Sequence, residues 1–176
     1  MGAAPTPSAA TNITFNGGIL LLSGQTAAVT VHANRNISLG ASGGTINNAD
    51  ATDQVTFGSI ISGSGDLIIN NGTAGTVIFS GTNTYAGATT ISGGTLSVGT
   101  LANGGSNSNI GASSNAAANL VINGGILKYT GAVVSINRLF TVGANGATID
   151  SSGTGALTFN NSGSLGTTAT TSPTLT

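Results

Sequence analysis

The side chains that could do chemistry are few and widely spaced in this chain. His32 could act as a general base, but catalysis would also need a nucleophile and an orienting partner, and no motif supplies them. Asp50 and Asp53 could offer oxygen ligands to Ca²⁺, yet such a site needs roughly six to eight ligands. We therefore expect no catalytic residue, no metal site and no cofactor, with His32 in a structural or surface position and the two aspartates in a solvated loop.

The composition excludes further classes of function. Only 4% of the 176 residues are charged, and the formal net charge is -1, which offers no field to attract nucleic acid. No apolar run approaches the roughly 18 to 20 residues that span a bilayer, so we expect no direct membrane insertion. The chain has no Cys and hence no disulfide. Its hydrophobic content of 39% nevertheless predicts a packed core.

Short apolar bursts such as Ile19–Leu22 and Leu67–Ile69 alternate with Gly-Gly, Asn-Gly and Ser-Gly steps. An Asn-Gly pair accepts the positive φ of a tight corner without steric cost. Such pairs begin at Asn16, Asn71, Asn103, Asn123 and Asn145. The best helical stretch, Ala116–Ala118, is too short to form a stable α-helix. The pattern predicts an all-β chain of strands of roughly three to six residues.

The bursts repeat. A small residue followed by two β-branched or aliphatic residues recurs at Gly18, Gly44, Gly75, Gly94, Gly125 and Ala147. The mean interval of about 26 residues suggests one coil per repeat. A longer duplication matches Asn12–Gly24 with Asn119–Gly131, Asn34–Ile46 with Asn137–Ile149, and Gly63–Asn71 with Gly153–Asn161. The chain thus reads as about one and a half copies of a unit near 105 residues.

Repeats of this size favour a solenoid, because one coil of short strands cannot bury its apolar side chains alone. We predict a right-handed single-stranded parallel β-helix of about six to eight coils, with a β-sandwich as the alternative. Residues 1–11 are expected to form a flexible leader and residues 12–170 the β-helix. Residues 171–176 would then be a tail that continues toward a next coil.

Residues 65–99 resemble the passenger-associated repeat of bacterial autotransporters. The centre of that family's pattern is matched by Asn83, Thr84, Tyr85 and Gly87, and its end by Gly93, Gly94, Thr95 and Leu96. The segments around Arg35 and Arg138 also resemble the coil that precedes this repeat in the family. Together these regions cover most of the chain from residue 12 to residue 161.

The resemblance implies a β-helical passenger, exported through the outer membrane and displayed on or released from a Gram-negative cell. Family members end in a membrane β-barrel, and because nothing after Gly163 reads as one, this chain is expected to be passenger only. Adhesive or enzymatic activity in the family usually resides in loops or inserted domains. The longest candidate loops here are Asn47–Phe57 and Ala102–Asn119.

Three further residues have both a functional and a structural interpretation. Arg35 and Arg138 could bind an acidic sugar, but their duplicated positions favour one shared structural role, with the guanidinium bonding to corner carbonyls. Tyr85 could stack on a glycan ring, but its place in the repeat favours packing, with its hydroxyl tethered to backbone.

We therefore predict a non-enzymatic, extracellular stalk or display scaffold in an adhesion context. The alternative is a self-assembling β-solenoid that stacks end to end into a fibre, because few charges would repel a second rod. A pectin-lyase-type enzyme would need clustered acids and bases, which the sequence lacks. Expected partners are host-surface or neighbouring-cell ligands held by coil loops, or a second copy of the chain.

Overall fold

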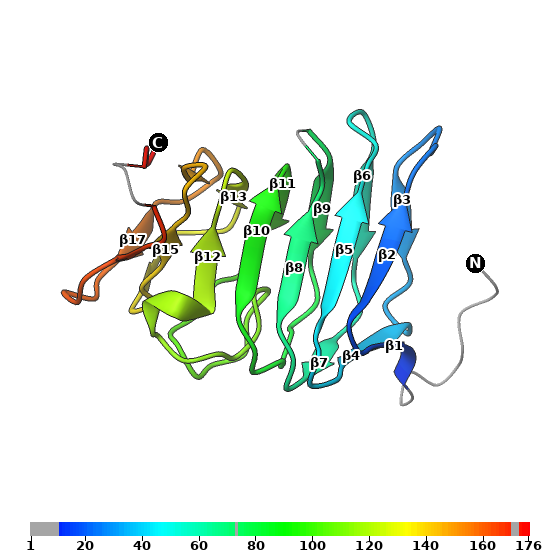
Figure 1. Cartoon of the computed structure of the whole chain (residues 1–176), viewed down its shortest axis with the longest axis horizontal. Coiled ribbons are helices and arrows are strands. Elements are labelled where there is room, and N and C mark those ends of the chain that lie inside the picture. The colour runs from blue at the N-terminus through cyan, green and yellow to red at the C-terminus, as the bar shows by residue number, and fades with distance from the viewer. Residues whose placement is uncertain (1–10, 73, 170–172) are drawn as a thin grey trace.

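The computed structural model is an all-β parallel solenoid whose largest sheet has seven strands, one from each coil (Figure 1). It describes residues 11–72, 74–169 and 173–176. The predicted leader lies outside the described residues except for Thr11, which is the first residue of a strand, and so do residues 171 and 172 of the predicted tail. The predicted parallel solenoid is confirmed, and the β-sandwich alternative is wrong.

Each coil contributes one segment to each of three faces, and every paired strand is parallel to its neighbour. The first face holds β1 (Thr11–Phe15), β4 (Asn36–Leu39) and β7 (Ile61–Gly63), and after an interruption β14 (Val134–Ile136) and β17 (Leu157–Phe159). The second face holds β2 (Gly18–Leu22), β5 (Gly44–Asn48), β8 (Leu67–Asn70), β10 (Thr89–Gly93), β12 (Leu120–Ile122), β15 (Thr141–Val142) and β18 (Gly166–Thr167). These seven strands belong to the first to the seventh coil, in this order. The third face holds β3 (Val29–Val31), β6 (Gln54–Phe57), β9 (Thr76–Phe79), β11 (Thr95–Val98), β13 (Ile126–Tyr129) and β16 (Thr148–Asp150).

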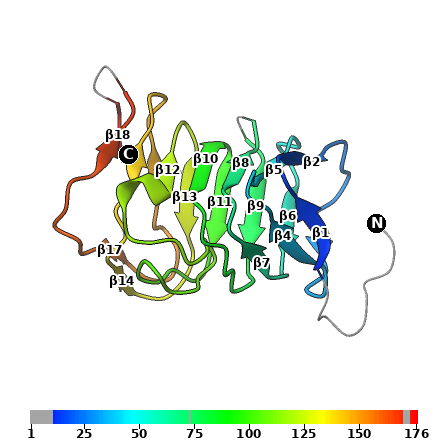
Figure 2. The same cartoon turned by 60° about the horizontal axis from the view of Figure 1, so that its bottom comes forward.

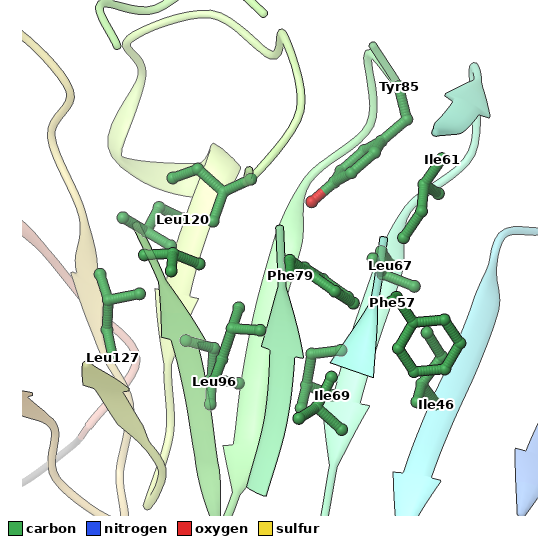
Figure 3. Close-up of a cluster of buried hydrophobic side chains, with 14 of the residues drawn as sticks. Ile46, Phe57, Ile61, Leu67, Ile69, Phe79, Tyr85, Leu96, Leu120 and Leu127 are labelled. Carbon is green, nitrogen blue, oxygen red and sulfur yellow. The ribbon is translucent and has the colours of Figure 1, made fainter. Parts of the chain in front are cut away.

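The core runs along the solenoid axis because alternate residues of each strand point inward (Figure 3). Val55, Val77 and Leu96 occupy successive positions of one inward row and are fully buried. In the next row Phe57 and Phe79 meet edge to face, with ring centroids 5.9 Å apart. Each buried side chain contributes roughly 1.5 to 3 kcal/mol, but only while the adjacent coil covers it.

The duplicated Asn-Gly-Gly sequence builds the same corner twice. The amide N–H of Ser42 donates to Asn16 Oδ1 at 3.0 Å, and the amide N–H of Asn145 donates to Asn123 Oδ1 at the same distance. The glycine after each asparagine has a positive φ, 91° at Gly17 and 84° at Gly124. Both Asn-Gly steps thus have the predicted positive φ, and each asparagine side chain also binds the corner of the next coil.

The two corners nevertheless join different faces. Asn16 lies between β1 and β2, where the first face passes into the second, and Asn123 lies between β12 and β13, where the second passes into the third (Figure 2). The three-residue pattern that recurs six times also changes face along the chain. Gly44 begins β5 on the second face, whereas Gly75 precedes β9 on the third. Each triplet still falls in a successive coil, as predicted, but this step also moves it to another face. All three faces use short strands of similar alternation, so sequence similarity alone does not identify the face.

One of the two predicted loops is largely strand. Only residues 49–53 of Asn47–Phe57 form a turn, because Val55 and Phe57 alternate with outward residues and are fully buried in β6. The second loop is an excursion of residues 99–119 without a β-strand, which ends in a 3₁₀ turn, η1 (Ala117–Asn119). Its residues 108–113 return to the first face and complete the fifth coil. Over the described residues, no helix has the length and apolar character of a membrane span.

The C-terminal residues lie alongside the third face. The amide N–H of Ala147 donates to Thr174 O at 2.9 Å, and that of Ile149 donates to Thr176 O at 3.0 Å. Leu175 forms a parallel bridge with Ala147. Residues 174–176 thus supply the third side of the seventh coil.

Candidate functional site

The centre of the repeat motif fills the first face of the fourth coil, where no named strand forms. Asn83 is 1% exposed, and its side chain joins three coils. Its Oδ1 accepts from the amide N–H of Ile61 in the third coil at 2.8 Å, and its Nδ2 donates to Asn109 O in the fifth at 2.6 Å. The amide therefore adds side-chain bonds between coils to the backbone bonds that Asn83 and Thr84 make with Ser108 and Ile61.

Replacing Asn83 with alanine is expected to lower the free energy of unfolding by about 2 kcal/mol, because it leaves a buried N–H and a buried C=O without their partner. Thr84→Ala is the matched control, since Thr84 is adjacent and exposed. Urea denaturation of both variants measures the difference. Equal midpoints would show that the Asn83 side chain does not hold the coils together.

Tyr85 lies inside the core, with its hydroxyl pointing toward the axis (Figure 3). The hydroxyl is 2.6 Å from Thr89 Oγ1, which itself donates to Ile110 O at 3.3 Å. The Tyr85 hydroxyl was predicted to bond to the backbone, but it bonds to the side chain of Thr89, the buried first residue of β10. Thr89 in turn makes the bond to the backbone. Complete burial leaves no ring face for a glycan, and it raises the pKa of Tyr85 above its ordinary value of 10.0.

Stability should consequently fall at alkaline pH. Tyr85 stays neutral in the fold while the unfolded chain loses the phenol proton near pH 10, so its contribution is complete below pH 10 and declines as the pH rises further. Tyr85→Phe should cost about 1 kcal/mol at pH 7 through the lost hydrogen bond. The difference in the free energy of unfolding between the wild type and Tyr85→Phe should become smaller above pH 10. Urea titrations of both proteins at pH 7 and pH 11 would measure it. A difference that stays constant would contradict a neutral buried phenol.

The remaining motif residues occupy distinct positions along the same coil. Gly87 packs against the backbone of the third coil, and Gly93 and Gly94 form the corner between β10 and β11. Leu96 is buried in the core, whereas Thr95 points outward. The motif thus specifies one turn of scaffold, with Thr84 exposed and Thr95 pointing outward.

Arg138 is buried at 1% exposure and binds the 99–119 excursion from the sixth coil. Its Nε donates to Ala102 O at 2.9 Å and its Nη1 to both the carbonyl and the hydroxyl of Ser113 at 3.1 Å. Its Nη2 donates to Gly111 O at 3.0 Å and Ser106 O at 3.4 Å. All five bonds go to neutral oxygens, and burial lowers the pKa of this guanidinium from its ordinary 12.5, an effect that nearby Tyr85 opposes.

The structure does not bring the other singled-out residues into one cluster. His32 and Arg35 lie in the turn after β3, where exposed His32 accepts the amide N–H of Asn34 at Nδ1 and Arg35 is half-buried. Asp50 and Asp53 lie in the turn between β5 and β6, and Thr52 bonds the Asp50 carboxylate and lowers its pKa. Among the described residues no group of three or more His, Cys, Asp or Glu could hold a metal ion.

A groove on the outer side of the third face is the feature that sequence reasoning missed. It encloses about 470 Å³ and crosses five consecutive strands, from β6 to β16. One lining row places Gln54, Thr76 and Thr95 in register, and the next places Ser97, Lys128 and Asp150 in register. The lining residues are outward positions of their strands, which the alternation in the sequence identifies. Which of these positions lie side by side depends on the register between coils, which the sequence pattern does not give.

Lys128 and Asp150 form an ion pair at one end of the groove, with Nζ 3.1 Å from Oδ2. Their side chains are 41% and 28% exposed. Hydrogen bonds from Ser152, followed by Lys128, lower the pKa of Asp150 to about 2. The Asp150 carboxylate is therefore ionised at neutral pH and faces Lys128 Nζ.

Comparison with known proteins places the repeat in context. Residues 74–98 match the family described as passenger-associated-transport-repeat, a segment that runs from β9 through the fourth coil to β11. The chain is similar to "Adhesin BmaC autotransporter" of Brucella suis biovar 1 (strain 1330), at 59% identity over 44 residues. That match covers 24% of this chain and 1% of the relative, so the chain spans a very small part of its length. No solved structure matches significantly. The resemblance seen in the sequence is confirmed.

Proposed function

We propose that this parallel β-solenoid, which carries an autotransporter passenger repeat, is a stalk that holds other regions of a surface-exposed or secreted protein away from a Gram-negative cell. The observation that carries the proposal is the repeat itself, in which Asn83 binds the coils on both sides and Tyr85 is buried in the core with its hydroxyl on Thr89. The relative's name supports an adhesion context. A rod stabilised only by neighbouring coils can be lengthened without changing its cross-section.

The proposal includes a non-catalytic role. His32 and Arg35 lie at one corner of the solenoid and Asp50 and Asp53 at another, so these groups do not form a nucleophile with its base. Arg138, the one buried cation among the described residues, has its donors occupied by the excursion.

Display on intact cells tests the stalk function. The chain, with an epitope inserted at exposed Ala51–Thr52, would replace part of the passenger of an autotransporter in a Gram-negative host. We expect antibody labelling of unpermeabilised cells and loss of the epitope on treatment with external protease. Epitope detected only after permeabilisation would overturn the proposal.

Electron microscopy of the purified chain separates the stalk from the fibre alternative. Discrete rods at every concentration support a stalk segment. Filaments that lengthen with concentration and show a spacing of about 4.8 Å along their axis would instead support end-to-end assembly.

A further inference from the structure

The groove lies on the outer side of the third face. The strands that carry most of its lining, β9, β11 and β13, run side by side on that face (Figure 2). The groove volume of about 470 Å³ lies within the roughly 300 to 1,000 Å³ of small-ligand sites. The floor is formed by Ser97, which points outward yet is nearly buried. The hollow is therefore a depression in the sheet surface and not a gap between loops.

The polar side chains of the groove are available to a ligand. Within the described residues, the hydroxyls of Thr76, Thr95 and Ser97 and the side-chain amide of Gln54 have no hydrogen-bond partner. By contrast, Thr130 at the rim donates to Val98 O at 3.2 Å. Each free hydroxyl can both donate and accept, as can the amide. The complementary ligand must likewise carry several groups that donate and accept.

The charge of the groove restricts the ligand further. Lys128 and Asp150 are its charged residues, and they neutralise each other across 3.1 Å. A free anion would meet Asp150 and a free cation would meet Lys128, so the groove has no net attraction for either. Asp150 Oδ1 already accepts the amide N–H of Ser152 at 2.8 Å, and the remaining lone pairs of the carboxylate and the other Lys128 N–H groups can bond hydroxyl groups. Neutral ligands rich in hydroxyls are favoured.

The apolar part of the lining comes from Ile78 and Ile126, which stand between the polar positions on neighbouring strands. A ligand with both C–H surface and hydroxyls fits this alternation. An extended peptide does not, because β9, β11 and β13 are paired on both sides and leave no backbone edge to which a strand could add.

We propose that this groove binds a neutral saccharide of a few sugar units, lying along the solenoid axis across β9, β11 and β13. The hydroxyls of Thr76, Thr95 and Ser97 bond the sugar hydroxyls, the Lys128–Asp150 pair holds one end, and the two isoleucines contact the ring carbons. The inference adds a binding activity to the stalk and does not depend on it.

The test uses the 176-residue chain on a microarray of immobilised neutral, sialylated and sulfated oligosaccharides. We expect binding to neutral members. Amide chemical shifts of the labelled chain, titrated with the strongest soluble member, should change in β9, β11 and β13. Thr95→Val with Ser97→Ala should weaken binding about tenfold or more, through two lost hydrogen bonds.

A matched control exists in the same coil. Thr90 and Ser92 point outward from β10 on the second face, as Thr95 and Ser97 do from β11 on the third. Thr90→Val with Ser92→Ala should leave binding unchanged. Lys128→Met with Asp150→Asn, which keeps the net charge, gives a second disruption of the groove and should also weaken binding.

Three outcomes would overturn the proposal. These are no binding to any neutral oligosaccharide, binding confined to sialylated or sulfated members, and binding that both groove variants retain at the strength of the β10 control. Circular dichroism of each variant confirms that a loss of binding is not a loss of fold.

Discussion

Replacing Arg138 with methionine is expected to lower the free energy of unfolding by about 4 kcal/mol and to release the 99–119 excursion. Methionine fills a similar volume but donates no hydrogen bond. Ala102 O would lose the partner that the structure shows for it, whereas Ser113 O and Gly111 O would keep the amide of Gly105 and the hydroxyl of Ser108. The cost is less than the sum of five bonds because burying the guanidinium is itself unfavourable, as the lowered pKa indicates.

The excursion depends on Arg138 because the fifth coil has no strand on its first face. Residues 108–113 lie there between Tyr85 of the fourth coil, whose carbonyl accepts the amide N–H of Ala112 at 2.8 Å, and Arg138 of the sixth. Without the guanidinium, one side of this layer loses its anchor. Hydrogen exchange should accelerate at the amides of Gly105, Asn109 and Ala112 and remain slow in β5 and β8.

Two further variants separate charge from geometry. Arg138→Lys keeps the charge but has three donors on one atom, so it should recover only part of the lost stability. Lys128→Met removes an exposed basic residue with a single ion pair and should cost less than about 1 kcal/mol. If Arg138→Met unfolds at the same urea concentration as Lys128→Met, the buried guanidinium does not anchor the excursion.

Local patterns in the sequence predict the strands and corners well. Alternation places Val55 and Phe57 in the core, and the Asn-Gly steps at Asn16 and Asn123 produce the positive φ that the corners need. Both patterns depend on residues that are close in the sequence, so they can be read without knowing which coil lies next to them. The repeat motif also predicts the solenoid fold, because its pattern covers more than one full coil.

The assignment of strands to faces and the construction of the candidate site depend on contacts between coils. Arg138 reaches a carbonyl 36 residues earlier in the chain, and the excursion between them has no periodic pattern that would indicate the pairing. The groove needs the register of five strands before Thr95, Ser97 and Lys128 become neighbours. A one-residue change of register would turn these side chains into the core. Such sites follow from the stacked structure and not from any single repeat.

Replacing Gly87 with alanine is expected to lower the free energy of unfolding by about 3 kcal/mol. A Cβ at this position would lie 2.2 Å from Gly65 O and 2.3 Å from Gly65 C in the coil below. Both obstacles are backbone atoms, so no side-chain rotation relieves the clash. Moving the third coil away does not help either, because a Cβ at Gly65 would itself lie 1.9 Å from Gly40 O, which shows how closely the next coil follows.

The repeat motif therefore requires glycine at position 87 for the spacing between coils. Displacing residue 87 would also disturb the bond that the amide N–H of Ala88 donates to the Asp66 carboxylate at 2.8 Å. Gly58→Ala is the matched control, because its Cβ would meet nothing closer than 3.7 Å and should change the stability by less than about 0.5 kcal/mol. Urea denaturation of the two variants compares a glycine under backbone contact with one that has space. Equal midpoints would mean that the coils can separate at Gly87, and the motif glycine would then need an explanation other than close packing.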